Sequence, residues 1–174
     1  MLHITYDLLS QEDFNILQNI CADFDKLKID EINTKEKSNF DNRFFVKEGV
    51  LKTYYDRLDE FLKLNIDQNK YNVLNLPKPN SWVNKVVPET NKNDTFHRDM
   101  SFLTAVTYLN DDFTDGEFAY KDINNDVILI NPQINKTLIM DETLLHRVSP
   151  VTNGNRFSLV TFFQFSPKEK KTLL

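Results

Sequence analysis

The chain has 174 residues, of which 40% are hydrophobic, which is enough for one domain with an apolar core. Its net charge is −5, so it lacks the excess of basic residues that is typical of a general nucleic-acid-binding protein. A single cysteine, Cys21, excludes an internal disulfide bond and fits a reducing compartment. Because the sequence has neither a leader-like N-terminus nor a run of about 18 apolar residues, we expect a cytoplasmic protein without a membrane span. Its Asn- and Lys-rich composition suits a phage or bacterial gene.

Two amphipathic helices are predicted near the N-terminus. Ser10 begins an N-cap pattern with Asp13, and apolar residues then recur at helical spacing, which predicts a helix over residues 11–26. Residues 28–42 are polar and are expected to form a surface loop. A second apolar stripe predicts a helix over residues 49–64. In both helices the stripe is interpreted as a core-packing face rather than as a cofactor site.

Short strands are predicted after Tyr71, where prolines punctuate the chain and helices are disfavoured. The apolar, β-branched segments Phe102–Leu109 and Arg156–Phe165 carry the strongest strand patterns. Shorter strands are predicted at Trp82–Val87, Glu117–Tyr120, Val127–Ile130 and Thr137–Met140. A mainly β fold with N-terminal helices follows, in which about eight short strands form a jelly-roll or barrel-like pair of sheets.

The segment FHRDMSF, residues 96–102, holds one of only three histidines in the chain. Side chains two residues apart share a face of an extended segment, so His97 and Asp99 are predicted to point together. An imidazole and a carboxylate are two of the three ligands in a facial triad for non-haem Fe(II), and His146 can supply the third if the strands fold back on each other. The H-x-D pattern by itself also fits a structural histidine, so both interpretations stay open on this pattern.

Arg156 follows His146 by ten residues and begins an otherwise apolar strand. A guanidinium in such a place needs an anionic partner, and its planar fork matches a carboxylate with two parallel hydrogen bonds. A salt bridge to an acidic residue at the sheet rim is one interpretation. The spacing after His146 favours a bound dicarboxylate instead.

In their order along the chain, four segments resemble the 2-oxoglutarate- and Fe(II)-dependent dioxygenases of the prolyl 4-hydroxylase-like group. They are FHRD, TAVTYLNDDF, DGEF and LHRVSPVTNGNRFSLV, and the last is especially similar to the PKHD-type hydroxylases of that group. The resemblance implies a double-stranded β-helix core of the jelly-roll or cupin-like type over residues 71–166. Residues 1–70 would supply the supporting helices within a single domain of residues 1–174.

The resemblance also implies roles for individual residues. His97, Asp99 and His146 would bind Fe(II), and Arg156 would pair with the distal carboxylate of the co-substrate 2-oxoglutarate. Tyr108 matches a tyrosine that hydrogen-bonds the same carboxylate in related prolyl hydroxylases, although a core tyrosine with a satisfied hydroxyl is a competing interpretation. Because Asp99 is present, the resemblance implies a hydroxylase rather than a halogenase. Such an enzyme uses O2, releases succinate and CO2, and is expected to use ascorbate as a further cofactor.

Two departures from the family pattern concern the surroundings of the site. Gly116 stands alone where many relatives have a double glycine, which leaves the shape of that loop open. The segment before His97 lacks the Tyr-x-x-Gly pattern common in relatives. Trp82, Asn84 and Lys85 are the candidates to line the pocket instead.

The prime substrate is the least determined part of this interpretation. A peptidyl, prolyl-type substrate and a free amino acid or other small molecule both fit the resemblance, and the loops expected to contact it are residues 28–46, 88–95 and 110–126. Two other classes of protein stay open, namely a non-catalytic cupin-like metal-binding module and a nucleic-acid demethylase. The acidic balance and scattered lysines disfavour the demethylase, which would need a basic groove.

Overall fold

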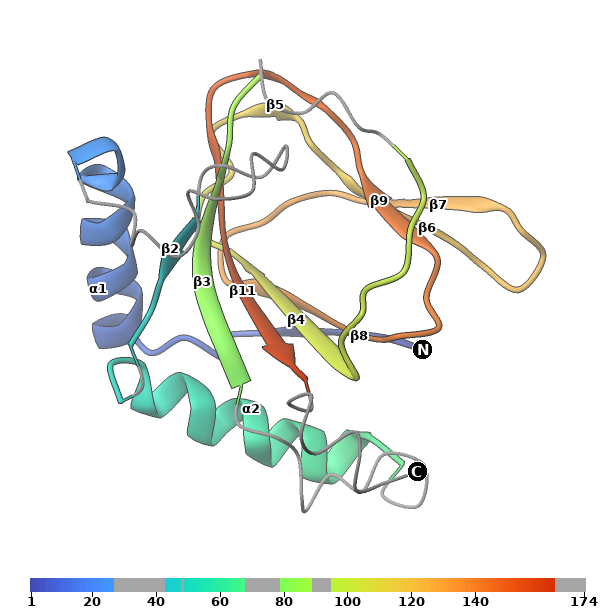
Figure 1. The fold of residues 1–174 in the computed structure, drawn as a ribbon, viewed down its shortest axis with the longest axis horizontal. Helices are drawn as coiled ribbons and strands as arrows, with labels where there is room; N and C mark the ends of the chain where they lie inside the picture. The colour runs from blue at the N-terminus through green and yellow to red at the C-terminus, as the bar shows by residue number, and fades with distance from the viewer. Residues whose placement is uncertain (27–42, 48, 68–78, 89–94, 165–174) are drawn as a thin grey trace.

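The computed structural model describes residues 1–26, 43–47, 49–67, 79–88 and 95–164, and these ranges form a mainly β structure with two helices against one sheet (Figure 1). The predicted fold class is confirmed. The predicted loop at residues 28–42 lies outside the described residues, as does the end of the last predicted strand at Phe165.

The two helices lie where the sequence predicts them, with shifted ends. Helix α1 (Gln11–Ala22) begins at the N-cap Ser10, whose hydroxyl accepts a hydrogen bond from the Asp13 backbone N–H at 3.1 Å. A short 3-10 turn (Phe24–Lys26) follows in place of the helix's predicted last turn. Helix α2 (Lys52–Asn65) starts later than predicted because Gly49 has φ +86°, a left-handed conformation that a helix cannot include.

A six-stranded antiparallel sheet, here called the major sheet, forms the centre of the molecule. Its strands follow one another in the order β1 (Leu2–Tyr6), β8 (Lys136–Asp141), β4 (Leu103–Tyr108), β11 (Arg156–Phe163), β3 (Pro79–Val86) and β2 (Arg43–Phe45). Both helices cover its outer face (Figure 1). Leucines of the helices pack there against Val83, Leu103 and Leu159, which closes the larger apolar core.

The inner face of the major sheet looks toward a smaller layer of strands (Figure 1). That layer contains the three-stranded sheet β7 (Val127–Ile130), β6 (Phe118–Lys121) and β9 (His146–Val148), and the pair β5 (Thr114–Asp115) and β10 (Val151–Asn153). A second apolar cluster fills part of the space between the layers with Tyr108, Phe118, Leu138 and Met140. Both sheets therefore contribute side chains to one interior.

Strands β1 and β2 were not predicted, since no strand was expected before Trp82. Both occupy an edge of the major sheet, and neither contains a fully buried residue. Strand β2 has only three residues, too few for a recognisable pattern, whereas β1 alternates Leu2, Ile4 and Tyr6 with polar residues over only five positions. Each is fixed by backbone pairing with a strand remote in the sequence, β8 for β1 and β3 for β2.

No helix within the described ranges combines the length and the apolar character that crossing a membrane requires.

Candidate active site

His97 and His146 are brought together by their own backbones. The His97 N–H donates to the His146 carbonyl at 2.8 Å, and the His146 N–H donates to the His97 carbonyl at 2.9 Å. His146 is the first residue of β9, whereas His97 lies before β4 and is joined to β9 only by this isolated bridge. The two imidazole rings consequently lie 4.6 Å apart, centroid to centroid.

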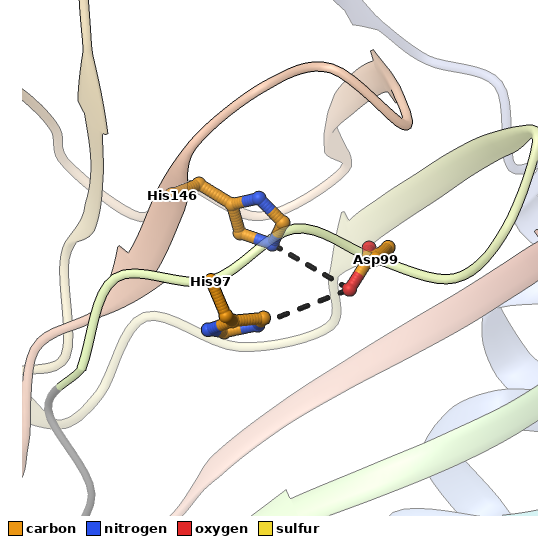
Figure 2. A group of neighbouring side chains, drawn as sticks. All are labelled: His97, Asp99 and His146. Carbon is orange, nitrogen blue, oxygen red and sulfur yellow. Dashed lines mark ion pairs between the residues drawn. The ribbon is translucent and has the colours of Figure 1, made fainter.

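The Asp99 carboxylate completes a cluster with the two imidazoles (Figure 2). Its Oδ1 lies 3.8 Å from Nε2 of His97 and 3.7 Å from Nε2 of His146. One potential ligand atom from each residue lies within 4.8 Å of the others. Two imidazole nitrogens and one carboxylate oxygen on one side of a site match the donor set of non-haem Fe(II), and three coordination positions would stay open.

Hydrogen bonds at the far ring nitrogens fix the tautomer of both histidines. Nδ1 of His97 lies 3.1 Å from the Thr95 carbonyl, and Nδ1 of His146 lies 3.0 Å from the Leu144 carbonyl. A carbonyl can only accept, so each Nδ1 carries the proton and each Nε2 presents a lone pair toward Asp99. Burial lowers the pKa of His146, which the Asp99 carboxylate partly counteracts. The neutral form that a metal requires is thereby favoured.

Arg156 is a buried cation in the same interior. Its Nη1 donates to the Gly116 carbonyl at 3.2 Å, and its buried Nε has no hydrogen-bond partner among the described residues. None of the ion pairs found in the described part of the chain includes this guanidinium. Burial lowers the pKa of Arg156, an effect that Tyr108 opposes. A buried guanidinium with a vacant donor is suited to bind an anion.

Tyr108 and Ser158 lie beside Arg156 on the inner face of the major sheet. Ser158 pairs with Tyr108 across β11 and β4, and it shares a face with Arg156 because the two are two residues apart. The Ser158 hydroxyl is buried without a partner among the described residues. Burial raises the pKa of the Tyr108 phenol to about 12, although Arg156 counteracts part of the rise. The phenol therefore keeps its proton at neutral pH and can donate it to an anion.

The cluster of His97, Asp99 and His146, here called the metal-type cluster, and the buried Arg156 both border the inner face of strand β4. Thr104 and Tyr108 alternate onto the same face of β4. The Thr104 hydroxyl donates to Asp99 at 2.8 Å, while Tyr108 lies beside Ser158. A dicarboxylate held at Arg156 by one end can thus direct its other end along β4 toward the histidines.

The structure brings His97, Asp99 and His146 together in one cluster, in which the His97 side chain is 48% exposed, and places Arg156 and Tyr108 in the buried interior beside it. Three of the other predicted positions can also be compared with the structure. Trp82 and Asn84 lie on the inner face, in register with Val160 and Ser158 of β11. Lys85 does not: it lies on the opposite face of β3, where its Nζ binds both carboxylate oxygens of Asp25 at 2.6 and 2.7 Å. Its predicted place in the pocket was wrong, because strand alternation separates it from Asn84.

Ser158 was missed as a functional candidate. Its position two residues after Arg156 places it on the same face of the strand, and this could have identified it from the sequence.

We expect Ser158→Ala to weaken 2-oxoglutarate binding about 3- to 10-fold, because one neutral hydrogen bond to the carboxylate is lost. Titration of 2-oxoglutarate into the anaerobic, Fe(II)-loaded protein measures the effect. Ser149→Ala, a serine outside this inner face, is the control, and an equal loss in both variants would remove Ser158 from the site.

Comparison with known proteins agrees with this arrangement. Residues 61–164 match the family model of the 2OG-Fe(II) oxygenase superfamily, which is more than half of the chain. The chain belongs to this superfamily. The predicted dependence of this oxygenase on Fe(II) and 2-oxoglutarate is thereby confirmed at the level of the family. No curated protein matches the sequence significantly.

Solved structures confirm the double-stranded β-helix fold of the oxygenase. A prolyl-4-hydroxylase from Pseudomonas putida superposes with a TM-score of 0.72 at 17% identity, covering 94% of this chain and 92% of that one. A Trichoplax adhaerens prolyl hydroxylase, solved in complex with a hypoxia inducible factor peptide fragment, gives 0.70 at 15% identity over 98% and 86%. A viral collagen prolyl hydroxylase from Paramecium Bursaria Chlorella virus-1, solved with 2OG, gives 0.62 at 14% identity over 95% and 96%.

Proposed function

We propose that the protein hydroxylates a prolyl residue of a peptide, converting 2-oxoglutarate and O2 to succinate and CO2. One oxygen atom of O2 would enter the succinate and the other the hydroxylated product, so the reaction needs no further substrate. The similarity of the fold to several prolyl hydroxylases supports the substrate class. The observation that carries it in this chain is an aromatic surface next to the metal-type cluster.

The aromatic surface consists of Phe162, Trp82 and Phe45 on the inner face of the major sheet. Phe162 pairs with Thr104, the residue that bonds Asp99, so this surface begins beside the cluster. The buried Trp82 ring packs edge-on to Phe162 at 4.8 Å and lies 5.8 Å from Phe45, a residue that is 40% exposed, so Trp82 supports the two phenylalanines from below. The flat apolar face of an aromatic ring can pack against the CH groups of a pyrrolidine ring.

Different residues of the site would bind the metal, the co-substrate and the prime substrate. His97, Asp99 and His146 would hold iron, and Arg156 with its neighbours would bind the distal carboxylate of 2-oxoglutarate. When bound, these two groups supply the oxidising chemistry. The chain supplies orientation, because the aromatic surface would hold the prolyl ring beside the cluster.

The first test compares substrates of the two open classes. We expect prolyl-containing peptides to stimulate succinate formation and to gain the mass of one oxygen atom, whereas free proline and the other free amino acids leave succinate formation at its basal rate. Omitting ascorbate tests its predicted role as a cofactor. Hydroxylation of a free amino acid with no product from any peptide would replace the peptidyl assignment by a small-molecule hydroxylase.

A variant of the aromatic surface tests where the peptide binds. Phe162→Ala is expected to raise the peptide KM about 10-fold or more while the affinity for 2-oxoglutarate stays unchanged, because only packing with the prime substrate is lost. Phe157→Ala is the matched control, since this ring faces outward from the same strand and packs against Phe24 at 5.8 Å. Equal peptide KM values in the two variants contradict the assignment.

A further inference from the structure

The outer oxygen of the Asp99 carboxylate is held by a buried threonine. The Oγ1 of Thr104 donates to Asp99 Oδ2 at 2.8 Å, while the other oxygen, Oδ1, faces Nε2 of both histidines. Thr104 is the second residue of β4 and is 2% exposed. The two oxygens of one carboxylate are thus distinguished by their surroundings, and only Oδ1 is directed at the histidine nitrogens.

A second hydroxyl sets the direction of that hydrogen bond. Ser101, which is 1% exposed, shares a hydrogen bond with Thr104 through their hydroxyl oxygens. Each hydroxyl has one proton, and the proton of Thr104 is committed to the carboxylate, which can only accept. Ser101 must therefore donate to Thr104. The two hydroxyls form a directed chain that ends at Asp99 Oδ2.

The backbone around Asp99 does not by itself fix the rotation of its carboxylate. Asp99 lies between the isolated bridge at His97 and the start of β4, in a segment without regular secondary structure. The end of this segment is anchored, because the Phe102 N–H donates to the Phe163 carbonyl at 2.9 Å. Ser101 and Thr104 stand on the anchored side and can thus hold the carboxylate still.

We propose that Thr104, supported by Ser101, is a positioning residue that makes Asp99 a ligand through one oxygen only. The inference rests on the proposed metal site. A freely turning carboxylate can bind a metal through both oxygens and would then occupy a coordination position that 2-oxoglutarate or O2 needs. With Oδ2 held by Thr104, the carboxylate keeps one position and leaves the remaining ones open. Such outer hydrogen bonds typically contribute about 10- to 100-fold to metal affinity.

The test uses Co(II) as a visible probe in place of Fe(II). The full chain and its variants are titrated anaerobically, and the dissociation constant and the intensity of the visible Co(II) bands are recorded. We expect Thr104→Val to weaken binding about 10-fold or more and to change the band intensity, which follows coordination number. Thr104→Ser, which keeps the hydroxyl, should restore both values. Ser101→Ala should shift both in the same direction by less.

The control variant is Thr107→Val, in the same strand. Thr107 is equally buried, and its hydroxyl bonds that of Thr137 at 2.8 Å on the outer face of the major sheet. The Thr107→Val variant has the same chemical change as Thr104→Val and is expected to lose a comparable amount of stability, but Thr107 does not contact Asp99. Its Co(II) affinity should equal that of the unmodified chain, with thermal unfolding confirming that both valine variants are folded.

The outcomes separate this inference from the proposed function. If the unmodified chain does not bind Co(II), the metal site and the inference fail together. If it binds Co(II) and Thr104→Val binds equally tightly with unchanged bands, the metal site stands and the positioning role is wrong. An equal loss of affinity in Thr107→Val would also overturn it, because the effect would then be one of general packing.

Discussion

Asp99→Ala is expected to abolish 2-oxoglutarate turnover and to weaken Fe(II) binding by more than about 100-fold, which exceeds the loss usual for an outer hydrogen-bond partner of a metal ligand. The carboxylate would be the only anionic ligand of the cluster, and its Oδ1 is the atom that both histidine nitrogens face. Its removal leaves two neutral imidazoles for a divalent cation. Fe(II) affinity and succinate formation, measured on the same preparation, give the result.

The fold is expected to survive this change. Asp99 lies outside the regular strands, and the backbone bridge between His97 and His146 does not involve its side chain. Asp56→Ala on the exposed face of α2 is the control for loss of a carboxylate elsewhere. Turnover by Asp99→Ala at the rate of the unmodified chain would exclude Asp99 as a metal ligand.

Arg156→Ala is expected to lower the affinity for 2-oxoglutarate by about 100-fold or more, while Fe(II) binding stays within about 3-fold of normal. The reason is that two charge-assisted hydrogen bonds to one carboxylate disappear, each of which contributes about 1.5–3 kcal/mol. The weak absorption band that 2-oxoglutarate gives with Fe(II) reports its binding in the absence of oxygen. Arg156→Lys should recover only part of the affinity, because an ammonium keeps the charge without the planar fork.

Arg57→Ala serves as the matched control for this experiment. Arg57 is exposed on α2 and donates to the Asp7 carbonyl at 2.9 Å, far in the fold from the inner face of the major sheet. Unchanged 2-oxoglutarate affinity in Arg156→Ala would mean that the buried arginine only stabilises the loop at Gly116. Loss of Fe(II) binding together with 2-oxoglutarate binding would instead indicate that the interior as a whole had been disrupted.

Much of the site could be predicted from the sequence because its signals are local. His97 and Asp99 are two residues apart, and Arg156 begins one of the two segments with the strongest strand patterns. Strand alternation also predicts the position of Ser158, because a residue two places after Arg156 lies on the same inner face. The same rule excludes Lys85 from that face, because it places the neighbours Asn84 and Lys85 on opposite faces of β3.

The remaining features depend on contacts between distant segments. The chain from Ser101 through Thr104 to Asp99 needs a turn whose conformation no local pattern specifies, and it is fixed by the pairing of β4 with β11. Strands β1 and β2 likewise form only where a remote partner offers its backbone. Strand β2 is too short for a periodic pattern, and the alternation of Leu2, Ile4 and Tyr6 in β1 spans only five residues, so both were absent from the prediction.

The bridge between His97 and His146 bears on how the protein would acquire and lose its metal. Its two hydrogen bonds are made entirely by backbone groups, and both Nδ1 atoms are held by carbonyls of their own segments. The positions of the two imidazoles are therefore held by hydrogen bonds within the polypeptide. In small zinc domains the chain folds around its ion and unfolds when a chelator removes it. Here we expect folding and metallation to be separate events, so that the chain could lose its metal to a chelator and take it up again in its native state.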